Sequence, residues 1–186
     1  MKKTLEIIAG PNGSGKTTFA ETALSNRKNA LYINSDSIAR GLTLNGNKYA
    51  QYESGRIMLE KINDCLKNNM SFSFETTMSG RVWSSFIRRA KNQRYRIVLY
   101  FVFVESISIS LERIKNRVKH GGHDIDIDIV NRRFSRTFSN FMNRYAPLAD
   151  EWYIINNTHE PQTVALKKNG KTSLLNKKIF QLFFRS

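Results

Sequence analysis

The chain has 186 residues and an apolar content of 40%, which is enough for one domain with a sizeable buried core. Its formal net charge of +15 indicates a polyanionic partner, which can be a nucleotide, a nucleotide sugar or a nucleic acid, although a basic surface without a specific partner would look the same. The single cysteine, Cys65, excludes an internal disulfide and a cysteine metal site, and no stretch approaches the roughly 20 apolar residues of a membrane span. We therefore expect a cytoplasmic protein.

The first predicted strand, Thr4–Ala9, runs directly into residues 10–18, G-P-N-G-S-G-K-T-T, which match the Walker A motif. Its glycines let the backbone turn so tightly that successive N–H groups point at one anion, and a helical pattern follows. We expect Lys16 to reach the β- and γ-phosphates and the Thr17 hydroxyl to bind Mg²⁺. The whole loop is a predicted triphosphate site: Gly10, Pro11, Asn12, Gly13, Ser14, Gly15, Lys16, Thr17 and Thr18.

Four further strands are predicted, at residues 30–34, 71–75, 95–104 and 152–156. The run at 95–104 is apolar almost throughout, as is typical of a central strand that is buried on both faces. Amphipathic helices are predicted between the strands, at 48–69, after Gly80, at 107–118 and at 134–145. This alternation predicts an α/β P-loop NTPase fold, a three-layer α/β/α sandwich with a mostly parallel five-stranded sheet.

Residues 1–186 are predicted to form this single domain, with 166–186 as a basic C-terminal appendage of it. Within the appendage, residues 172–175 are a candidate edge strand. Ile179, Leu182 and Phe183 are a candidate helical face.

Ligands of a doubly wound sheet gather at the carboxyl ends of its strands, so the residues that follow each strand are candidate site residues. Asp36 is the candidate base that accepts the proton of an acceptor hydroxyl, and its alternative role is that of an N-cap or first-turn acid. Glu75 is expected to orient Mg²⁺ through water or to hold the acceptor, with a surface acid as the alternative. The predicted acceptor contacts are Asn34, Asp36, Arg40, Glu75 and Thr77.

Residues 119–128, K-H-G-G-H-D-I-D-I-D, break the helical pattern and can form a lid over the triphosphate. Arginine side chains suit phosphate because their planar fork makes two hydrogen bonds at once. Arg117, together with Arg132 or Arg133, is the preferred clamp, so the predicted catalytic residues are Lys16, Asp36, Arg117, Arg132 and Arg133. The lid histidines, His120 and His123, lack zinc-site spacing and are expected to make the loop polar, with a contact to phosphate as the alternative.

Two absences favour a compact kinase over a motor or a GTPase. The apolar strand at 95–104 ends in Glu105-Ser106 and not in the aspartate of an ordinary Walker B motif, and the chain has no N-K-x-D for guanine.

Five blocks in this order resemble the zeta toxin family, and most closely its small branch that is often labelled as predicted ABC-type ATPases. They are G-P-N-G-S-G-K-T-T, I-N-S-D-S-I-A-R, F-S-F-E-T-T-M-S-G, R-V-K-H-G-G-H and N-R-R-F-S-R. The resemblance implies a P-loop kinase that uses ATP and Mg²⁺ to phosphorylate a UDP-activated amino sugar such as UDP-N-acetylglucosamine, and a small antitoxin protein as a partner.

Carried over by position, the resemblance makes Asp36 the base, Glu75 and Thr77 substrate contacts, and Arg117 with Arg132 or Arg133 the phosphate clamp. The small branch often has a proline shortly after G-G-H, where this chain has Asp124-Ile125-Asp126, so the lid is expected to differ in shape. Three alternatives remain open from the sequence. They are a kinase of another nucleotide or metabolite, a nucleic-acid-binding protein that uses ATP as a switch, and a protein that binds nucleotide without turnover.

Overall fold

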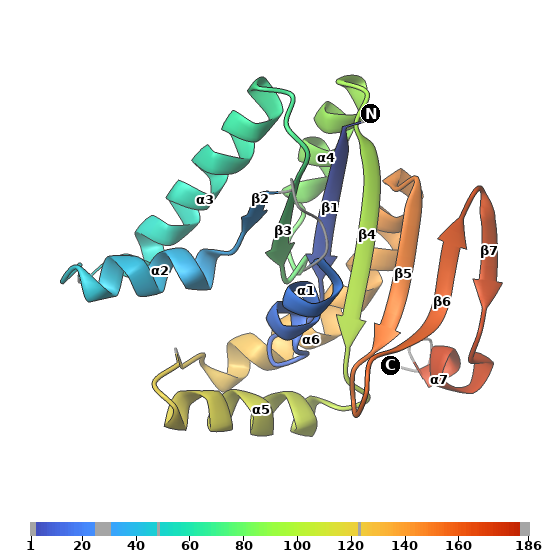
Figure 1. Ribbon diagram of the computed structural model, residues 1–186. Helices are drawn as coiled ribbons and strands as arrows, with labels where there is room; N and C mark the ends of the chain where they lie inside the picture. Colours follow the sequence, from blue (N-terminus) through green and yellow to red (C-terminus); the bar gives the residue numbers. More distant parts are fainter. Residues whose placement is uncertain (1–2, 25–30, 48, 123, 183–186) are drawn as a thin grey trace.

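The computed structural model describes residues 3–24, 31–47, 49–122 and 124–182, which form one seven-stranded sheet with helices around it (Figure 1). The spatial order of the strands is β2-β3-β1-β4-β5-β6-β7. Strands β1 to β5 pair in parallel, whereas β6 and β7 are antiparallel to their neighbours. The strands are β1 (Thr4–Ala9), β2 (Leu31–Ile33), β3 (Phe72–Thr76), β4 (Arg96–Phe103), β5 (Glu151–Asn156), β6 (Gln162–Lys168) and β7 (Lys171–Leu174).

The expectation of a five-stranded sheet is wrong by two strands. The five predicted strands form the parallel part, and β6 and β7 extend it at one edge. Strand β7 falls on the predicted edge strand at 172–175, but β6 was missed because only Val164 and Ala165 within it are fully buried. Two buried residues between polar ends make a weak hydrophobic pattern, and β6 becomes a strand by pairing with β5.

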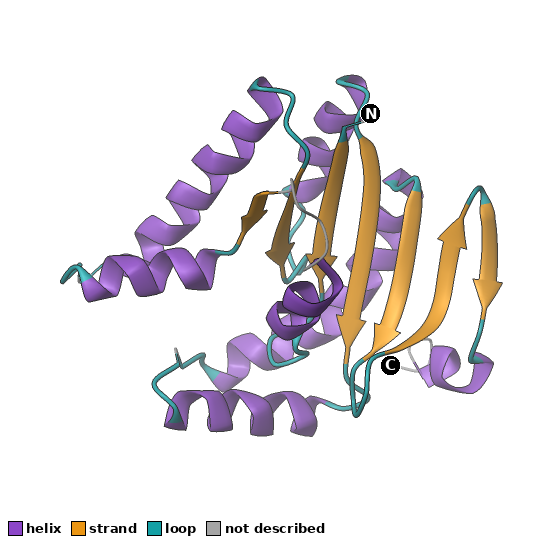
Figure 2. Ribbon diagram, in the orientation of Figure 1, coloured by secondary structure: helices purple, strands orange, loops and turns teal. Residues whose placement is uncertain are grey.

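The predicted helices are present in the same order along the chain (Figure 2). The helix expected at 48–69 is α3, and the one at 107–118 is α5. The stripe at 134–145 is divided between α6 and a short π-helix, η1. The helical elements are α1 (Lys16–Leu24), α2 (Ser35–Leu44), α3 (Ala50–Lys67), α4 (Trp83–Asn92), α5 (Ile107–Lys119), α6 (Ile127–Asn140), η1 (Phe141–Tyr145), η2 (Ala146–Leu148) and α7 (Lys177–Leu182). No helix within the described ranges is both long enough and apolar enough to cross a membrane.

The two faces of the sheet are covered unequally. One face carries the main core, where residues such as Phe74, Ile87 and Phe141 pack between the sheet and the helices α3, α4, α6 and η1. The other face carries a small cluster of Ile8, Ala20, Val102 and Ile155 under α1. Among the described helices, α1 is the one that Figure 1 shows over this face. The expected second helical layer is therefore reduced to a single short helix.

The register of the parallel strands brings the future site residues to one edge of the sheet. Strand β1 runs into the Walker A loop, and its last residues, Ile8 and Ala9, lie beside Glu75 and Thr76 of β3. Because β2 pairs with the other side of β3, helix α2 begins at the same edge. The order of the strands thus places the loop, β3 and α2 side by side.

Candidate active site

The Walker A loop between β1 and α1 has the backbone that its glycines permit. Gly10, Gly13 and Gly15 all have positive φ, and a Cβ on Gly13 would lie only 2.4 Å from the carbonyl oxygen of Ser110 on α5. The Asn157 side chain, directly after β5, donates a hydrogen bond of 2.8 Å to the Ser14 carbonyl oxygen. Helix α5 and the end of β5 therefore hold the loop from both sides.

Lys16 is turned into this loop, where its Nζ donates to the Pro11 carbonyl oxygen at 2.9 Å. Burial lowers the pKa of Lys16, although the nearby carboxylates of Glu75 and Asp36 act in the opposite direction. A buried cation beside a glycine-rich loop at the start of a helix suits an anionic ligand such as phosphate.

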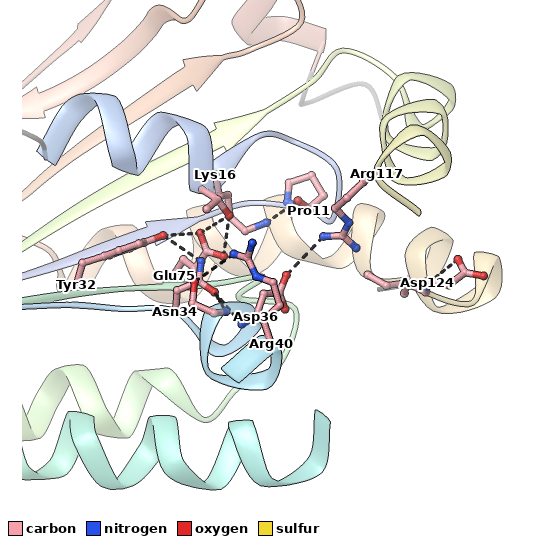
Figure 3. A network of polar contacts seen from close by, with 12 residues as sticks. Pro11, Lys16, Tyr32, Asn34, Asp36, Arg40, Glu75, Arg117 and Asp124 are labelled. Atoms are coloured by element: carbon pink, nitrogen blue, oxygen red, sulfur yellow. Dashed lines mark hydrogen bonds and ion pairs between the residues drawn. The ribbon is translucent and has the colours of Figure 1, made fainter. Parts of the chain in front are cut away.

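The carboxylate of Glu75 is the centre of a hydrogen-bond network that spans three elements (Figure 3). It accepts hydrogen bonds from the Thr17 hydroxyl, at 3.1 Å to each oxygen, and from the Tyr32 hydroxyl at 2.8 Å. Burial and the Glu75 carboxylate strongly raise the pKa of Tyr32, so its hydroxyl stays protonated and remains a donor.

The network continues from Tyr32 to the start of α2. The Asn34 side chain donates to the Tyr32 hydroxyl at 3.3 Å. Its oxygen accepts hydrogen bonds from the backbone N–H groups of Asp36 and Ser37, at 2.7 and 3.1 Å, so that Asn34 is the N-cap of α2. One chain of hydrogen bonds thus connects Thr17 to the helix turn that carries Asp36.

Asp36 lies in the first turn of α2, and its side chain faces the lid. Its Oδ2 is 3.5 Å from Nη1 of Arg117 on α5, and both side chains are partly exposed, 49% for Asp36 and 40% for Arg117. At this exposure the ion pair contributes little to stability. The contact between Asp36 and Arg117 is therefore a weak one in this structure.

The loop, α2, β3 and the lid enclose one cavity of about 870 Å³. Its wall includes Lys16, Asp36, Glu75, Arg117 and Arg133. A cavity of this size is typical of sites for small molecules and cofactors. The loop residues on the wall are Asn12, Gly13, Gly15, Lys16, Thr17 and Thr18.

The described part of the lid is tied to Arg117. The backbone N–H of Gly122 donates to the Arg117 carbonyl oxygen at 3.0 Å, and a Cβ on Gly122 would lie 2.8 Å from that oxygen and 2.5 Å from Cγ of Arg117. Asp124 and Asp126 line the cavity farther along the lid. His120 makes a hydrogen bond to the Asn116 carbonyl oxygen at 2.8 Å, and His123 lies outside the described residues.

Some candidate residues are not on the cavity wall. Of the two alternatives for the second clamp arginine, Arg133 lines the cavity, whereas Arg132 is exposed and does not. Arg40 is also absent from the wall and donates to the Ser37 hydroxyl at 3.4 Å. Asn34 is buried and serves as the helix cap. Thr77 does line the cavity, 3.0 Å from the Ser79 hydroxyl.

Other residues contribute to the site without having been among the candidates. Tyr32 is in the network, and Asn157, Met58 and Trp83 are on the wall. Asn157 directly follows a strand and could have been found by the strand-end rule. Met58 and Trp83 could not be predicted as site residues, because in a sequence an apolar residue on a helix is not distinguishable from a core residue.

Arg113 also lines the cavity, one helical turn before Arg117 on α5, and its guanidinium donates to the Thr158 carbonyl oxygen at 2.9 Å. In the sequence, Arg113 is one of the arginines that flank the glycine break and is a candidate phosphate contact, although Arg117 is preferred.

The oxygen donors beside the loop fit Mg²⁺. Within the described ranges no three or more His, Cys, Asp or Glu side chains form a metal-binding group. Mg²⁺ usually needs only one or two carboxylates, because phosphate and water oxygens complete its octahedron. The Thr17 hydroxyl and the Glu75 carboxylate, 3.1 Å apart, are the residues that would hold or orient it.

Comparisons with known proteins identify the family of this chain. A model of the Zeta toxin family matches residues 1–179. A relative from Haemophilus influenzae (strain ATCC 51907 / DSM 11121 / KW20 / Rd), described as an uncharacterized protein, is 32% identical over 137 residues, which are 72% of this chain and 94% of the relative.

Solved structures share the fold. A chain of the AvrRxo1-ORF1:AvrRxo1-ORF2 complex crystallised with sulphate ions is similar with a TM-score of 0.77 and 19% identity, over 97% of this chain but only 63% of that one. A chain of the PezAT chromosomal toxin-antitoxin system of Streptococcus pneumoniae is similar with a TM-score of 0.67 and 16% identity, over 100% of this chain and 80% of that one. The family match over residues 1–179 confirms the resemblance that the five sequence blocks indicated, and the chain belongs to the zeta toxin family.

Proposed function

We propose that this protein is an ATP-dependent kinase that transfers the γ-phosphate of ATP to a hydroxyl of a small anionic acceptor. The observation that carries the proposal is the convergence of Lys16, Asp36, Arg117 and Arg133 on one cavity of about 870 Å³. Phosphoryl transfer needs a positioned acceptor, a group that takes its proton and positive charge around the moving phosphate. These four side chains meet those needs.

In the proposed mechanism the loop N–H groups and Lys16 bind the β- and γ-phosphates of ATP. Asp36 accepts the proton of the acceptor hydroxyl, whose oxygen forms a bond to the γ-phosphorus. The bond from that phosphorus to the β–γ bridging oxygen breaks, and ADP leaves with the electron pair. Arg117 and Arg133 neutralise the transferred phosphoryl group, and Mg²⁺, when bound near Thr17 and Glu75, supplies further positive charge.

The ion pair between Asp36 and Arg117 gives this mechanism an opening step. Arg117 Nη1 is 3.5 Å from Asp36, so a two-bond contact of its planar fork with the γ-phosphate would compete with this ion pair. Binding of ATP would draw the guanidinium toward the phosphates and release the carboxylate for the acceptor hydroxyl. The Arg117 guanidinium would then pair with the phosphates, and the Asp36 carboxylate would accept a hydrogen bond from the acceptor hydroxyl.

A UDP-activated amino sugar such as UDP-N-acetylglucosamine is the first candidate acceptor, because the family resemblance points to it. Another nucleotide or metabolite is the alternative. Thr77, Met58 and Trp83 line the cavity, are not part of the Walker A loop and would contact the acceptor. The structural relatives come from a toxin-antitoxin system and from an ORF1:ORF2 complex, which supports a small antitoxin protein as a partner.

The test is a transfer assay with γ-labelled ATP, Mg²⁺ and a panel of UDP-sugars, nucleosides and other metabolites. The wild-type chain should label one class of acceptor. Asp36→Asn should reduce the rate of transfer at least about 100-fold while ATP affinity changes little, because a general base acts only in the chemical step. Asp64→Asn, at an exposed position on α3, is the matched control and should keep the wild-type rate. Label that appears only as free phosphate, equally for wild type and Asp36→Asn, would contradict the proposal.

A further inference from the structure

The face of the sheet that α1 only partly covers presents a continuous surface on strands β4 to β7 (Figure 1). The register places Tyr100, Tyr153, Leu166 and Ser173 side by side across the four strands. Lys168 and Lys171 are opposite each other in the β6–β7 pair and point to the same face, because they are two residues from Leu166 and Ser173. We call these six residues the open sheet face.

Aromatic rings form one half of the open sheet face. The rings of Tyr100 and Tyr153 are stacked, with their centroids 5.3 Å apart and 13° between their planes, and Phe19 of α1 lies 5.8 Å from Tyr100. Both tyrosines are partly exposed and cover the small cluster beneath them. Rings at the surface of a sheet offer π-faces and edges to planar ligands.

Positive charge dominates the other half of the open sheet face. No acidic residue follows Glu160 in the chain, whereas five lysines and one arginine do. Lys168 and Lys171 are exposed, and within the described residues neither has an ion-pair partner. Three strand acids belong to the same side of the sheet, but Glu6 and Glu151 are only 3% and 6% exposed, and Glu151 is paired with Arg96 at 2.6 Å. The third, Glu75, lies beside Ile8, is 9% exposed and faces the cavity. On strands β4 to β7, the charge that this side shows to solvent is therefore positive.

We propose that the open sheet face binds single-stranded RNA, with phosphates on Lys168 and Lys171 and unpaired bases against Tyr153 and Leu166. Lysines that follow a phosphate backbone, combined with aromatic side chains for the bases, are the features by which proteins bind single strands. A base-paired duplex offers its phosphates but keeps its bases away from the rings. The proposal goes beyond the kinase function, because none of these residues lines the cavity.

The test measures fluorescence anisotropy of a labelled single-stranded RNA of about 20 nucleotides with the full chain, at several salt concentrations. Lys168→Ala/Lys171→Ala should weaken binding at low salt by tenfold or more. Each lost phosphate contact removes about 0.7 from the slope of log affinity against log salt, so this variant should lose about 1.4. The matched control, Lys61→Ala/Arg88→Ala, removes the same charge from exposed positions on α3 and α4 and should keep the wild-type slope.

A second variant tests the contact with bases. Tyr153→Leu keeps an apolar residue over the small cluster and should weaken binding of the single strand about tenfold, with no change in salt slope. The ATP affinity of every variant should equal that of the wild type, which also reports a folded chain.

Three results would overturn the proposal. The first is no binding of the single strand at low salt, and the second is an equal loss in the lysine variant and its control. The third is equal binding of the single strand, the same RNA in a duplex and an acidic polypeptide, which would show a surface that selects negative charge alone.

Discussion

Among single residues, Lys16 has two conflicting effects: it favours the binding of phosphate but destabilises the free folded protein. Its ammonium group is placed for phosphate, yet without phosphate it is buried against the Pro11 carbonyl oxygen, and its pKa is lowered from the usual 10.5. A lowered pKa in the folded state means that the charged side chain destabilises the free protein. Such tension between stability and activity is common at binding sites.

Lys16→Met should therefore stabilise the free protein by about 1 kcal/mol at pH 7 while it abolishes ATP binding. The folded state binds the Lys16 proton more weakly than the unfolded state does, so the penalty is fully present below the folded-state pKa. It disappears as the pH rises through the usual value of 10.5, and the stability difference between variant and wild type should narrow there. Urea unfolding at pH 7 and near pH 10 measures both effects. A variant less stable than wild type at pH 7 would contradict this reasoning.

Tyr32 supports the site without lining the cavity. Its hydroxyl holds the Glu75 carboxylate at 2.8 Å and accepts a hydrogen bond from Asn34, the cap of α2. Tyr32→Phe should reduce kcat about tenfold and raise the Mg²⁺ concentration required for half-maximal rate, because residues that hold a metal-orienting carboxylate typically matter to that degree. ATP affinity without metal should not change.

The control for Tyr32→Phe is Tyr153→Phe, which removes a hydroxyl bonded to Glu151 at 3.1 Å, outside the cavity. If both variants lose the same activity, or if neither changes the Mg²⁺ requirement, Tyr32 has no role in positioning Glu75.

At the scale of elements, the lid between α5 and α6 depends on one close approach. Gly122 packs so tightly against Arg117 that a side chain there would collide with the backbone of Arg117 as well as with its Cγ. The arginine that pairs with Asp36 is therefore positioned by the turn that follows it.

Gly122→Ala should displace Arg117 and reduce kcat by about 10- to 100-fold, since small misplacements of catalytic groups have effects of that size. The control is Gly55→Ala in the middle of α3, where a Cβ would meet nothing within 4 Å. It should leave kcat unchanged and raise the free energy of unfolding by roughly 0.5–1 kcal/mol. Steady-state kinetics and urea unfolding of both variants separate the two effects, and a fully active Gly122→Ala enzyme would refute the role of the turn.

At the scale of the whole molecule, the net charge of +15 acts on every anionic ligand. ATP is drawn toward a cavity whose wall includes Lys16, Arg113, Arg117 and Arg133. The association rate of a fluorescent ATP analogue should fall roughly tenfold between low salt and about 0.5 M NaCl, while its dissociation rate changes much less. Stopped-flow measurements give both rates. A salt effect confined to dissociation would mean that long-range attraction does not contribute.

The C-terminal residues show how the whole molecule decides what a segment becomes. In the sequence, residues 166–186 form a basic stretch with only short candidate elements. In the fold, β6 covers the edge of β5, Ala165 is fully buried, and Ile179 and Phe180 of α7 pack on the main core. The segment thereby supplies two strands of the sheet and the lysines of the open sheet face.

The Walker A loop, the five parallel strands and the positions of Asp36 and Glu75 at strand ends could be read from the sequence, because each depends on local pattern and on a general rule of parallel sheets. The choice between Arg132 and Arg133 could not be made from the sequence. Neighbouring residues on a helix point in directions about 100° apart, and only the packing of α6 decides which of the two faces the cavity. The hydrogen bonds of Tyr32 with Glu75 and Asn34 likewise needed the tertiary structure. The bond between Tyr32 and Glu75 joins two separate strands, and sequence spacing does not say which side chains will meet across a sheet.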